Sequence, residues 1–287
     1  MPRNTKDTKK PASQPQSQPE ATPLNLLIRL LKWAAGLATA GMLALLMVIA
    51  LALSVAYPNL PDVSDMLNYR PKLPMRVFSA DGALIGEFGE ERRSLTPIKD
   101  IPQVMKDAVL AIEDARFFQH GGVDYLGVVR AGLANVGRSK SQGASTITMQ
   151  VARNFYLSTE KTFTRKIYEI LLALKIESQR TKPQILEIYM NQIFLGQRAY
   201  GFAAASEIYF GKPLAEITIG EAAMLAGLPQ APSAYNPVSN PKRATRRQQY
   251  IIDRMEANGF ITEDQAELAR NEVLRLRPPS EVAVHAE

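Results

Sequence analysis

The sequence predicts a mainly α domain with one small β-hairpin, preceded by an N-terminal transmembrane helix. Three observations support this fold class. Residues 33–57 contain no charged side chain, two short runs of alternating apolar residues flank Asp81-Gly82, and from Pro102 onward apolar residues recur at helical spacing almost without a break. With 287 residues, the chain is long enough for one anchor and one domain with a sizeable core.

The composition limits the chemistry that the chain can perform. It contains no cysteine, which excludes disulfides and thiolate metal sites. The formal net charge is +6, from 34 Lys and Arg against 28 Asp and Glu. This basic excess is compatible with anionic partners such as phosphates, nucleic acid or acidic lipid headgroups, and equally with an ordinary solvated basic surface.

The first element is a predicted membrane anchor at residues 29–57. Trp33 and Tyr57 bound its uncharged stretch, and aromatic rings favour the membrane interface. The alternative is a signal peptide cleaved near Ala56, but the apolar run exceeds the usual length of about 7–15 residues. By the positive-inside rule, the basic residues before the stretch predict a cytoplasmic N-terminus and an external position for residues 58–287. These basic residues are Arg3, Lys6, Lys9, Lys10, Arg29 and Lys32.

The rest of the chain divides by composition. Residues 1–28 include a Pro-, Gln-, Ser- and Lys-rich stretch and are expected to form a disordered cytoplasmic tail. Residues 58–74 contain four prolines and predict a linker. Residues 75–275 form the predicted domain, and the irregular residues 276–287 are interpreted as the start of a further domain. Three capping-box patterns predict helix starts: Thr181-x-x-Gln184, Thr218-x-x-Glu221 and Thr262-x-x-Gln265.

The first segment with candidate chemistry is residues 113–121. Glu113 and Asp114 end an amphipathic helix, where the helix dipole and the neighbouring acid both disfavour ionisation of a carboxyl. A carboxyl with a raised pKa suits a general base, although the same pattern is also typical of a surface acidic pair. His120 can titrate near neutrality, or can simply fix the loop through a hydrogen bond. Phe118 is counted with the substrate-binding candidates.

The second segment, residues 143–154, begins with Gly-x-Ser-Thr and leads into a helix. Ser145, Thr146 and free backbone N–H groups at a helix start are typical of an anion site, and Gln150 and Arg153 lie behind them on nearly the same face. The alternative for the hydroxyls is ordinary helix capping.

The third segment places Arg165, Lys166 and Glu169 on one helical face. This spacing fits a cationic phosphate site in which Glu169 orients the cations or a metal. It also fits a simple surface ion-pair cluster.

Taken in order, these segments resemble the peptidoglycan glycosyltransferase family, the lysozyme-like module of class A penicillin-binding proteins, over residues 75–275. One departure is Met149, where relatives often carry glutamine. The matching positions are Glu113, Asp114, Phe117, His120 and Gly122, then Gly143, Ser145, Thr146, Ile147 and Gln150, then Arg165, Lys166 and Glu169, then Ile185, Leu186, Glu187, Tyr189 and Asn191, with Arg246-Arg247 as the fifth motif.

The resemblance implies a two-lobed, lysozyme-like domain that polymerises lipid II into β-1,4 glycan strands. Glu113 would deprotonate the acceptor hydroxyl, the anomeric centre would invert, and undecaprenyl diphosphate would leave. A leaving diphosphate needs neutralising charge, so Arg153, Arg165 and Lys166 would bind it. Glu169 would place those cations, or would hold a divalent cation such as Mg²⁺ or Mn²⁺. No metal-ligand cluster is evident in the sequence.

The expected partners are lipid II, undecaprenyl-linked glycan, the membrane and other cell-wall synthesis proteins, with no nucleic acid. The expected location is the bacterial cytoplasmic (inner) membrane, with a single pass. The apolar residues 125–133 are expected either to dip into the interface or to pack in the core. The alternative functions are a lysozyme-type glycan-cleaving enzyme and an inactive membrane-anchored scaffold.

Overall fold

The computed structural model describes residues 23–63, 75–81, 84–88, 91–128, 145–157 and 163–278. The chain divides into two compact units, Met1–Asn59 and Leu60–Glu287. Residues 1–22 of the predicted tail, residues 64–74 of the predicted linker, residues 129–144 and residues 279–287 lie outside the described residues. The range 129–144 includes Gly143 and the second half of the predicted apolar stretch 125–133.

The first unit is a single long helix, α1 (Pro23–Ala56), followed by the short η1 (Tyr57–Asn59). Within it, Leu26–Val48 is long and apolar enough to cross a membrane, judged by length and composition. The helix begins at Pro23, six residues before the predicted anchor, and proline at the first helical position has a backbone angle already suited to a helix.

The predicted hairpin is present. β1 (Met75–Phe78) pairs antiparallel with β2 (Leu84–Phe88), and Met75 lies opposite Phe88. A second sheet, not predicted from the sequence, joins β3 (Arg92–Arg93) to β4 (Ala199–Tyr200) in parallel. Its two strands are too short to leave a periodic signal in the sequence.

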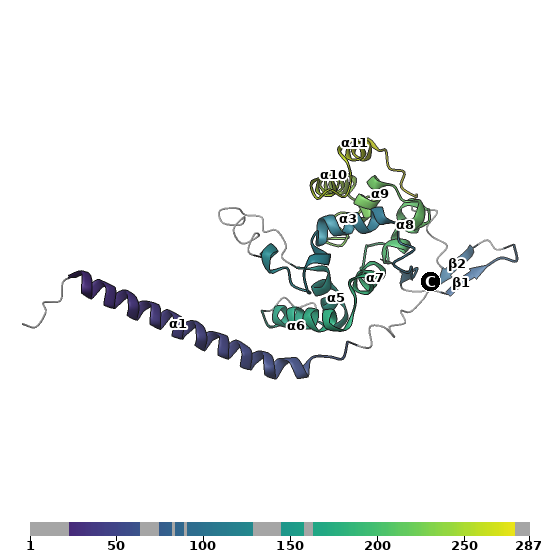
Figure 1. Ribbon diagram of the computed structural model, residues 1–287. Coiled ribbons are helices and arrows are strands. Elements are labelled where there is room, and N and C mark those ends of the chain that lie inside the picture. The colour runs from purple at the N-terminus through teal and green to yellow at the C-terminus, as the bar shows by residue number, and fades with distance from the viewer. Residues whose placement is uncertain are drawn as a thin grey trace, which may run out of the picture. The chain divides into compact units, whose positions relative to one another are not determined.

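Helices make up the rest of the second unit, which confirms the mainly α, two-lobed class. In one group α3 packs against α9 and α10, and α10 also packs against α11; in the other, α5 packs against α6 and α7 (Figure 1). The helices are α3 (Gln103–Glu113), η2 (Phe117–Gln119), α5 (Ile147–Tyr156), α6 (Phe163–Gln179), α7 (Lys182–Gln192), α8 (Phe202–Phe210), η3 (Leu214–Glu216), α9 (Ile219–Ala226), α10 (Pro241–Ala257) and α11 (Glu263–Asn271).

The three predicted capping boxes are confirmed at the starts of α7, α9 and α11. At α9, the Thr218 N–H donates to Glu221 Oε2 at 2.9 Å, while the Glu221 N–H donates to Thr218 Oγ1 at 3.2 Å. Each box satisfies backbone donors that the first helical turn leaves free.

The polar residues of the fourth motif hold the loop that follows β3 in place. Asn191 Oδ1 accepts from the Thr96 N–H at 2.8 Å, and Asn191 Nδ2 donates to Thr96 O at 2.9 Å. Glu187 Oε2 accepts from the Ile98 N–H at 2.7 Å. Gly201, at φ +83°, lies close behind Asn191. A Cβ added to Gly201 would lie 2.8 Å from the carbonyl oxygen of Asn191. This motif therefore acts in packing.

Candidate active site

Glu113 is the last residue of α3, and its side chain is partly exposed. The helix is fixed by Met105, Ala108 and Val109, which are fully buried. Gln150, one turn inside α5, donates from Nε2 to Glu113 Oε2 at 2.7 Å. The carboxyl group is thus carried by one helix group and bound by a side chain of the other.

Burial raises the pKa of Glu113, and the adjacent Asp114 raises it further. The Gln150 hydrogen bond, followed by the charges of Arg247 and Arg153, lowers the pKa of Glu113, but burial outweighs them. Removing a carboxylate from water penalises its charged form. The pKa of Glu113 is therefore above its ordinary value, so its carboxylate is a better proton acceptor than that of an exposed glutamate.

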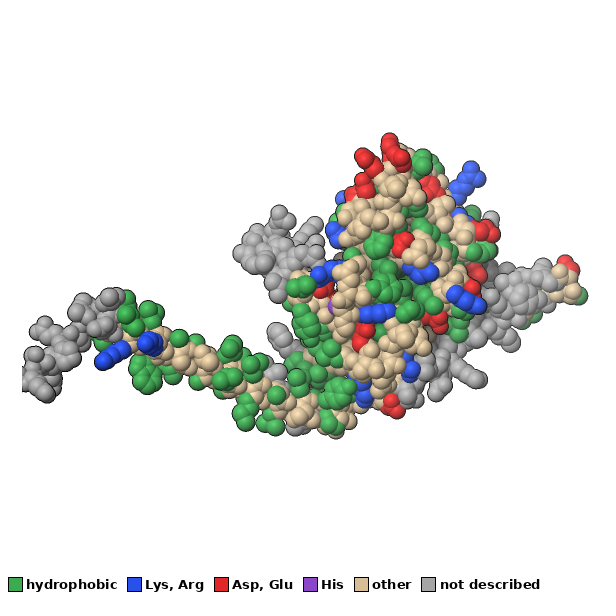
Figure 2. Space-filling model, viewed as in Figure 1, with side chains coloured by type: hydrophobic (Ala, Val, Ile, Leu, Met, Phe, Trp, Pro, Cys, Tyr) green, Lys and Arg blue, Asp and Glu red, His purple; other side chains and the backbone are tan. Residues whose placement is uncertain are grey.

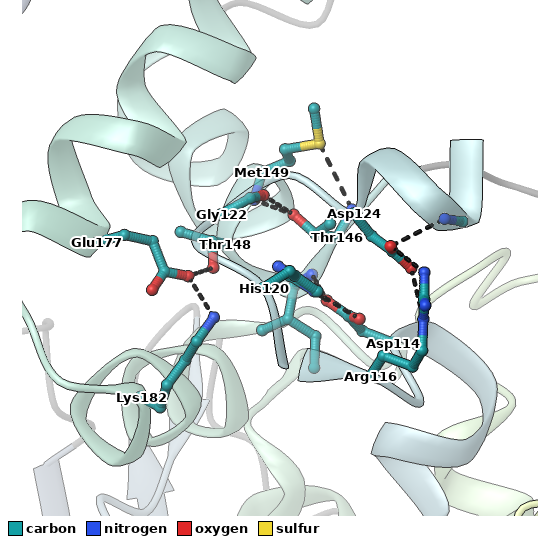
Figure 3. Close-up of polar contacts among 12 residues, drawn as sticks. Asp114, Arg116, His120, Gly122, Asp124, Thr146, Thr148, Met149, Glu177 and Lys182 are labelled. Atoms are coloured by element: carbon teal, nitrogen blue, oxygen red, sulfur yellow. Dashed lines mark hydrogen bonds and ion pairs between the residues drawn. The ribbon is translucent and has the colours of Figure 1, made fainter. Parts of the chain in front are cut away.

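Asp114 follows Glu113 in the chain and holds the start of α5, with its side chain facing His120 (Figure 3). Its carboxylate accepts from the backbone N–H of Ile147 at 3.1 Å and lies 2.9 Å from Nε2 of His120. The side chains of Asp114 and His120 are only 4% and 8% exposed. The structure thus brings both predicted residues to the site, in a buried network that fixes α3 against α5.

Thr146 caps α5 with its hydroxyl group (Figure 3). The hydroxyl oxygen accepts from the Met149 N–H at 3.2 Å, and the O–H donates to Gly122 O at 2.6 Å. Two of the N–H groups at this helix start therefore already have partners within the protein: Asp114 binds the Ile147 N–H, and Thr146 binds the Met149 N–H. Such early use of helix N-terminal donors follows from the need to satisfy them inside the protein.

The departure at Met149 also has a structural explanation. Its side chain packs in the core against Val123 and Ala173, and its sulfur lies 3.5 Å from the Thr146 N–H. Met149 therefore occupies the third helical position of a capping box, where glutamine is a favoured residue.

The third segment forms a cation cluster around a buried acid. Glu169 is 1% exposed, with Arg165 Nε 3.3 Å from Oε1 and Lys166 Nζ 2.9 Å from Oε2. Lys166 also donates to Ser145 Oγ at 2.9 Å. Because Ser145 and Gln150 lie five residues apart at the start of α5, this helix start contacts both Glu169's cluster and Glu113.

Two other predicted residues differ in their surroundings. Arg153, on α5, is close enough for its charge to lower the pKa of Glu113. Phe118 is 58% exposed and lines a cavity of about 280 Å³ with Lys99, Lys106 and Leu110. The Phe118 ring also lies edge-on to that of Phe117, with centroids 5.2 Å apart, and Phe117 in turn lies edge-on to His120 at 6.3 Å.

Arg247 is a site residue that sequence reasoning did not assign. It lies on α10, and its guanidinium is 5.5 Å from the ring centroids of both Tyr235 and Tyr250. Its charge lowers the pKa of Glu113 more than that of Arg153 does. In the sequence, Arg247 is marked only as part of the Arg246-Arg247 pair. Its effect on Glu113 could not be predicted from that pair, because only tertiary packing brings α10 against α3.

A metal bound by protein groups alone does not fit these residues. Both oxygens of Glu169 already face cations, and no group of three potential His, Asp or Glu ligands occurs in the described ranges of the chain.

Comparison with known proteins places the chain in a family. Residues 81–256, more than half of the chain, match the transglycosylase family model. Penicillin-binding protein 1A of Neisseria gonorrhoeae is 56% identical over 227 residues, which cover 79% of this chain and 28% of the relative. A putative transglycosylase of Cupriavidus necator is 61% identical over 181 residues, covering 63% of this chain and 78% of that protein.

A crystal structure of penicillin-binding protein 1A from Haemophilus influenzae is 30% identical, covers 73% of this chain and 22% of that one, and superposes with a TM-score of 0.43. The matched region spans 28% of the length of the Neisseria relative. The chain belongs to the transglycosylase family, and its helical unit is a glycosyltransferase domain of peptidoglycan synthesis.

Proposed function

We propose that this domain polymerises lipid II into β-1,4 glycan strands with release of undecaprenyl diphosphate. One observation carries the proposal: a partly exposed carboxyl of raised pKa, Glu113, is joined through α5 to a cluster of cations around Glu169. Proton acceptance and stabilisation of a leaving anion are the two requirements of this transfer.

In the proposed step, Glu113 accepts the proton of the acceptor sugar's 4-hydroxyl. The oxygen forms a bond to the anomeric carbon of the donor, while the bond from that carbon to the diphosphate oxygen breaks. Attack opposite the leaving group inverts the centre from α to β. The diphosphate departs as an anion, and the proton passes from Glu113 to solvent.

Arg153, Arg165 and Lys166 stabilise the departing diphosphate in this scheme. Of the two cations paired with Glu169, Lys166 is the more accessible, with 42% of its side chain exposed against 17% for Arg165. Glu169 keeps Arg165 and Lys166 in place as a buried counter-charge. Gln150 orients Glu113, while Asp114, His120 and Thr146 position the helix start that carries Gln150.

The membrane location follows from the substrates. α1 anchors the protein in the cytoplasmic membrane with its N-terminus inside and the domain outside, as the basic residues before the span predict. The exposed apolar residues Tyr125, Leu126 and Val128 assist by entering the interface. Confinement of enzyme and lipid substrates to one surface raises their effective concentration.

The test is to incubate the purified full-length chain with lipid II and to separate the products by size. Polymer is expected from the native protein, and Glu113→Gln is expected to abolish it without loss of folding. Glu216→Gln, at an exposed glutamate in η3, is the matched control and should polymerise normally. Water-cleaved fragments from added glycan strands would instead show a hydrolase, and retained polymerisation by Glu113→Gln would refute the assigned base.

A further inference from the structure

The first turns of α10 carry an unusual concentration of positive charge. Lys242, Arg243, Arg246 and Arg247 lie within six residues, and the first three are exposed. None of them has a carboxylate within ion-pair distance among the residues that the structure describes. Farther along α10, by contrast, Asp253 and Glu256 both pair with Arg270 of α11.

This arrangement is unfavourable for the free helix. Cations near a helix N-terminus oppose the helix dipole, and like charges four residues apart repel each other, as do Lys242 with Arg246 and Arg243 with Arg247. The first turn contains no acidic residue to offset them. A bound anion at the start of α10 would relieve both penalties.

The cluster is continuous with the candidate active site. α10 packs against α3, which ends at Glu113, and the Arg247 charge acts on the Glu113 carboxyl (Figure 1). Arg247 is held between Tyr235 and Tyr250, and its Nε is buried with no hydrogen-bond partner among the described residues. Arg243 lies one turn earlier, about 6 Å along the helix axis, also beside the Tyr235 ring at 5.4 Å.

The proposed reaction requires two diphosphate sites. The donor's diphosphate leaves beside the reacting carbon, where Arg153, Arg165 and Lys166 are assigned. The acceptor keeps its own diphosphate, one disaccharide away from the attacking hydroxyl, and that group also has to be held. We propose that Arg243 and Arg246 of α10 bind the acceptor's lipid diphosphate. This inference rests on the proposed polymerase function and adds a second, separate anion site to it.

The experiment uses the full-length chain with two substrate analogues. One is a lipid-linked disaccharide with a blocked acceptor hydroxyl, which can act only as donor. The other carries a methylene group in place of the anomeric oxygen, so that its diphosphate cannot leave and it can act only as acceptor. For Arg243→Gln/Arg246→Gln we expect the KM for the acceptor to rise at least tenfold, with the donor KM and kcat within twofold of native. The acceptor KM should also become less sensitive to salt.

The matched control is Arg254→Gln/Arg275→Gln, which removes two positive charges elsewhere, Arg254 lying about 12 Å along α10 from Arg246. It should leave both KM values unchanged. The Arg243→Gln/Arg246→Gln protein should also melt at a higher temperature than native, because the repulsion is gone; this separates a binding defect from misfolding.

Three outcomes would overturn the assignment: an unchanged acceptor KM, an equal rise in both KM values, or a loss limited to binding of phosphatidylglycerol vesicles. The last would assign the cluster to membrane headgroups. Absence of any product from the native chain would instead reject the polymerase proposal itself.

Discussion

The amide of Gln150 donates to the carboxylate of Glu113 at 2.7 Å, across the two helix groups of the domain. Because this bond favours the ionised form, it limits how far burial raises the pKa of Glu113. A base must be deprotonated to act, so activity should rise with pH through the raised pKa of Glu113, above the ordinary value of 4.5.

Replacing Gln150 with Met removes this bond. The pKa of Glu113 should then rise further, moving the acidic limb of the kcat/KM profile to higher pH and lowering activity at neutral pH by about 10-fold or more. The control is Gln103→Met, which removes an amide bonded to Asp107 on the same helix at 2.7 Å. An unshifted limb in Gln150→Met would contradict the role of the bond.

Glu113→Gln should maintain or increase stability while abolishing activity. A carboxyl whose pKa is higher in the folded than in the unfolded state costs stability once it is ionised, so stability attributable to Glu113 falls as pH rises through its raised pKa. Denaturant unfolding of both proteins at pH 5 and pH 8 would measure this. The variant's advantage should be larger at pH 8.

Asp114→Asn should weaken both folding and catalysis. The carboxylate accepts a backbone N–H at the start of α5 and holds His120, and loss of buried charge-assisted bonds costs about 1–3 kcal/mol. We expect a lower free energy of unfolding together with a reduced kcat, because α5 carries Gln150. Normal kcat in a destabilised Asp114→Asn protein would show that the network does not position the base.

Glu169→Gln should weaken the hold on the two cations that pair with Glu169, Arg165 and Lys166. Arg165 and Lys166 would lose a buried counter-charge, but both reach solvent, so we expect a loss of about 1–3 kcal/mol, below the 3–5 kcal/mol typical of a fully buried pair. Polymerisation should fall by at least 10-fold. The control is Glu263→Gln, at an exposed glutamate. Equal activity of the Glu169→Gln and Glu263→Gln proteins would reject the assigned role of Glu169.

Gln197 lies in a turn with φ +50°, a left-handed conformation unfavourable for most side chains. Gln197→Gly should stabilise the domain by about 0.5–1 kcal/mol, or a few degrees in Tm, without altering activity. Gly201→Ala is the opposite test, since the new Cβ would lie 2.8 Å from Asn191 O and destabilise the domain. Thermal melts of both variants suffice.

Several features were predictable because they depend on residues close together in the sequence. The apolar stretch in α1, the Asp81-Gly82 hairpin and the capping boxes of α7, α9 and α11 each rest on local periodicity or on pairs three residues apart. Glu113 and Glu169 could be named as candidate site residues for the same reason. Glu113 adjoins Asp114 at a predicted helix end, and Glu169 lies three and four residues from two cations.

The partners of those side chains were decided only by tertiary structure. Gln150 reaches Glu113 across 37 residues, Asp114 satisfies an N–H that the sequence left open to a substrate anion, and α10 brings the charge of Arg247 to Glu113. Local spacing determines which face of a helix a residue occupies. Which helices meet depends on how their apolar faces are buried together, and this sets the burial and charges that control the pKa of Glu113.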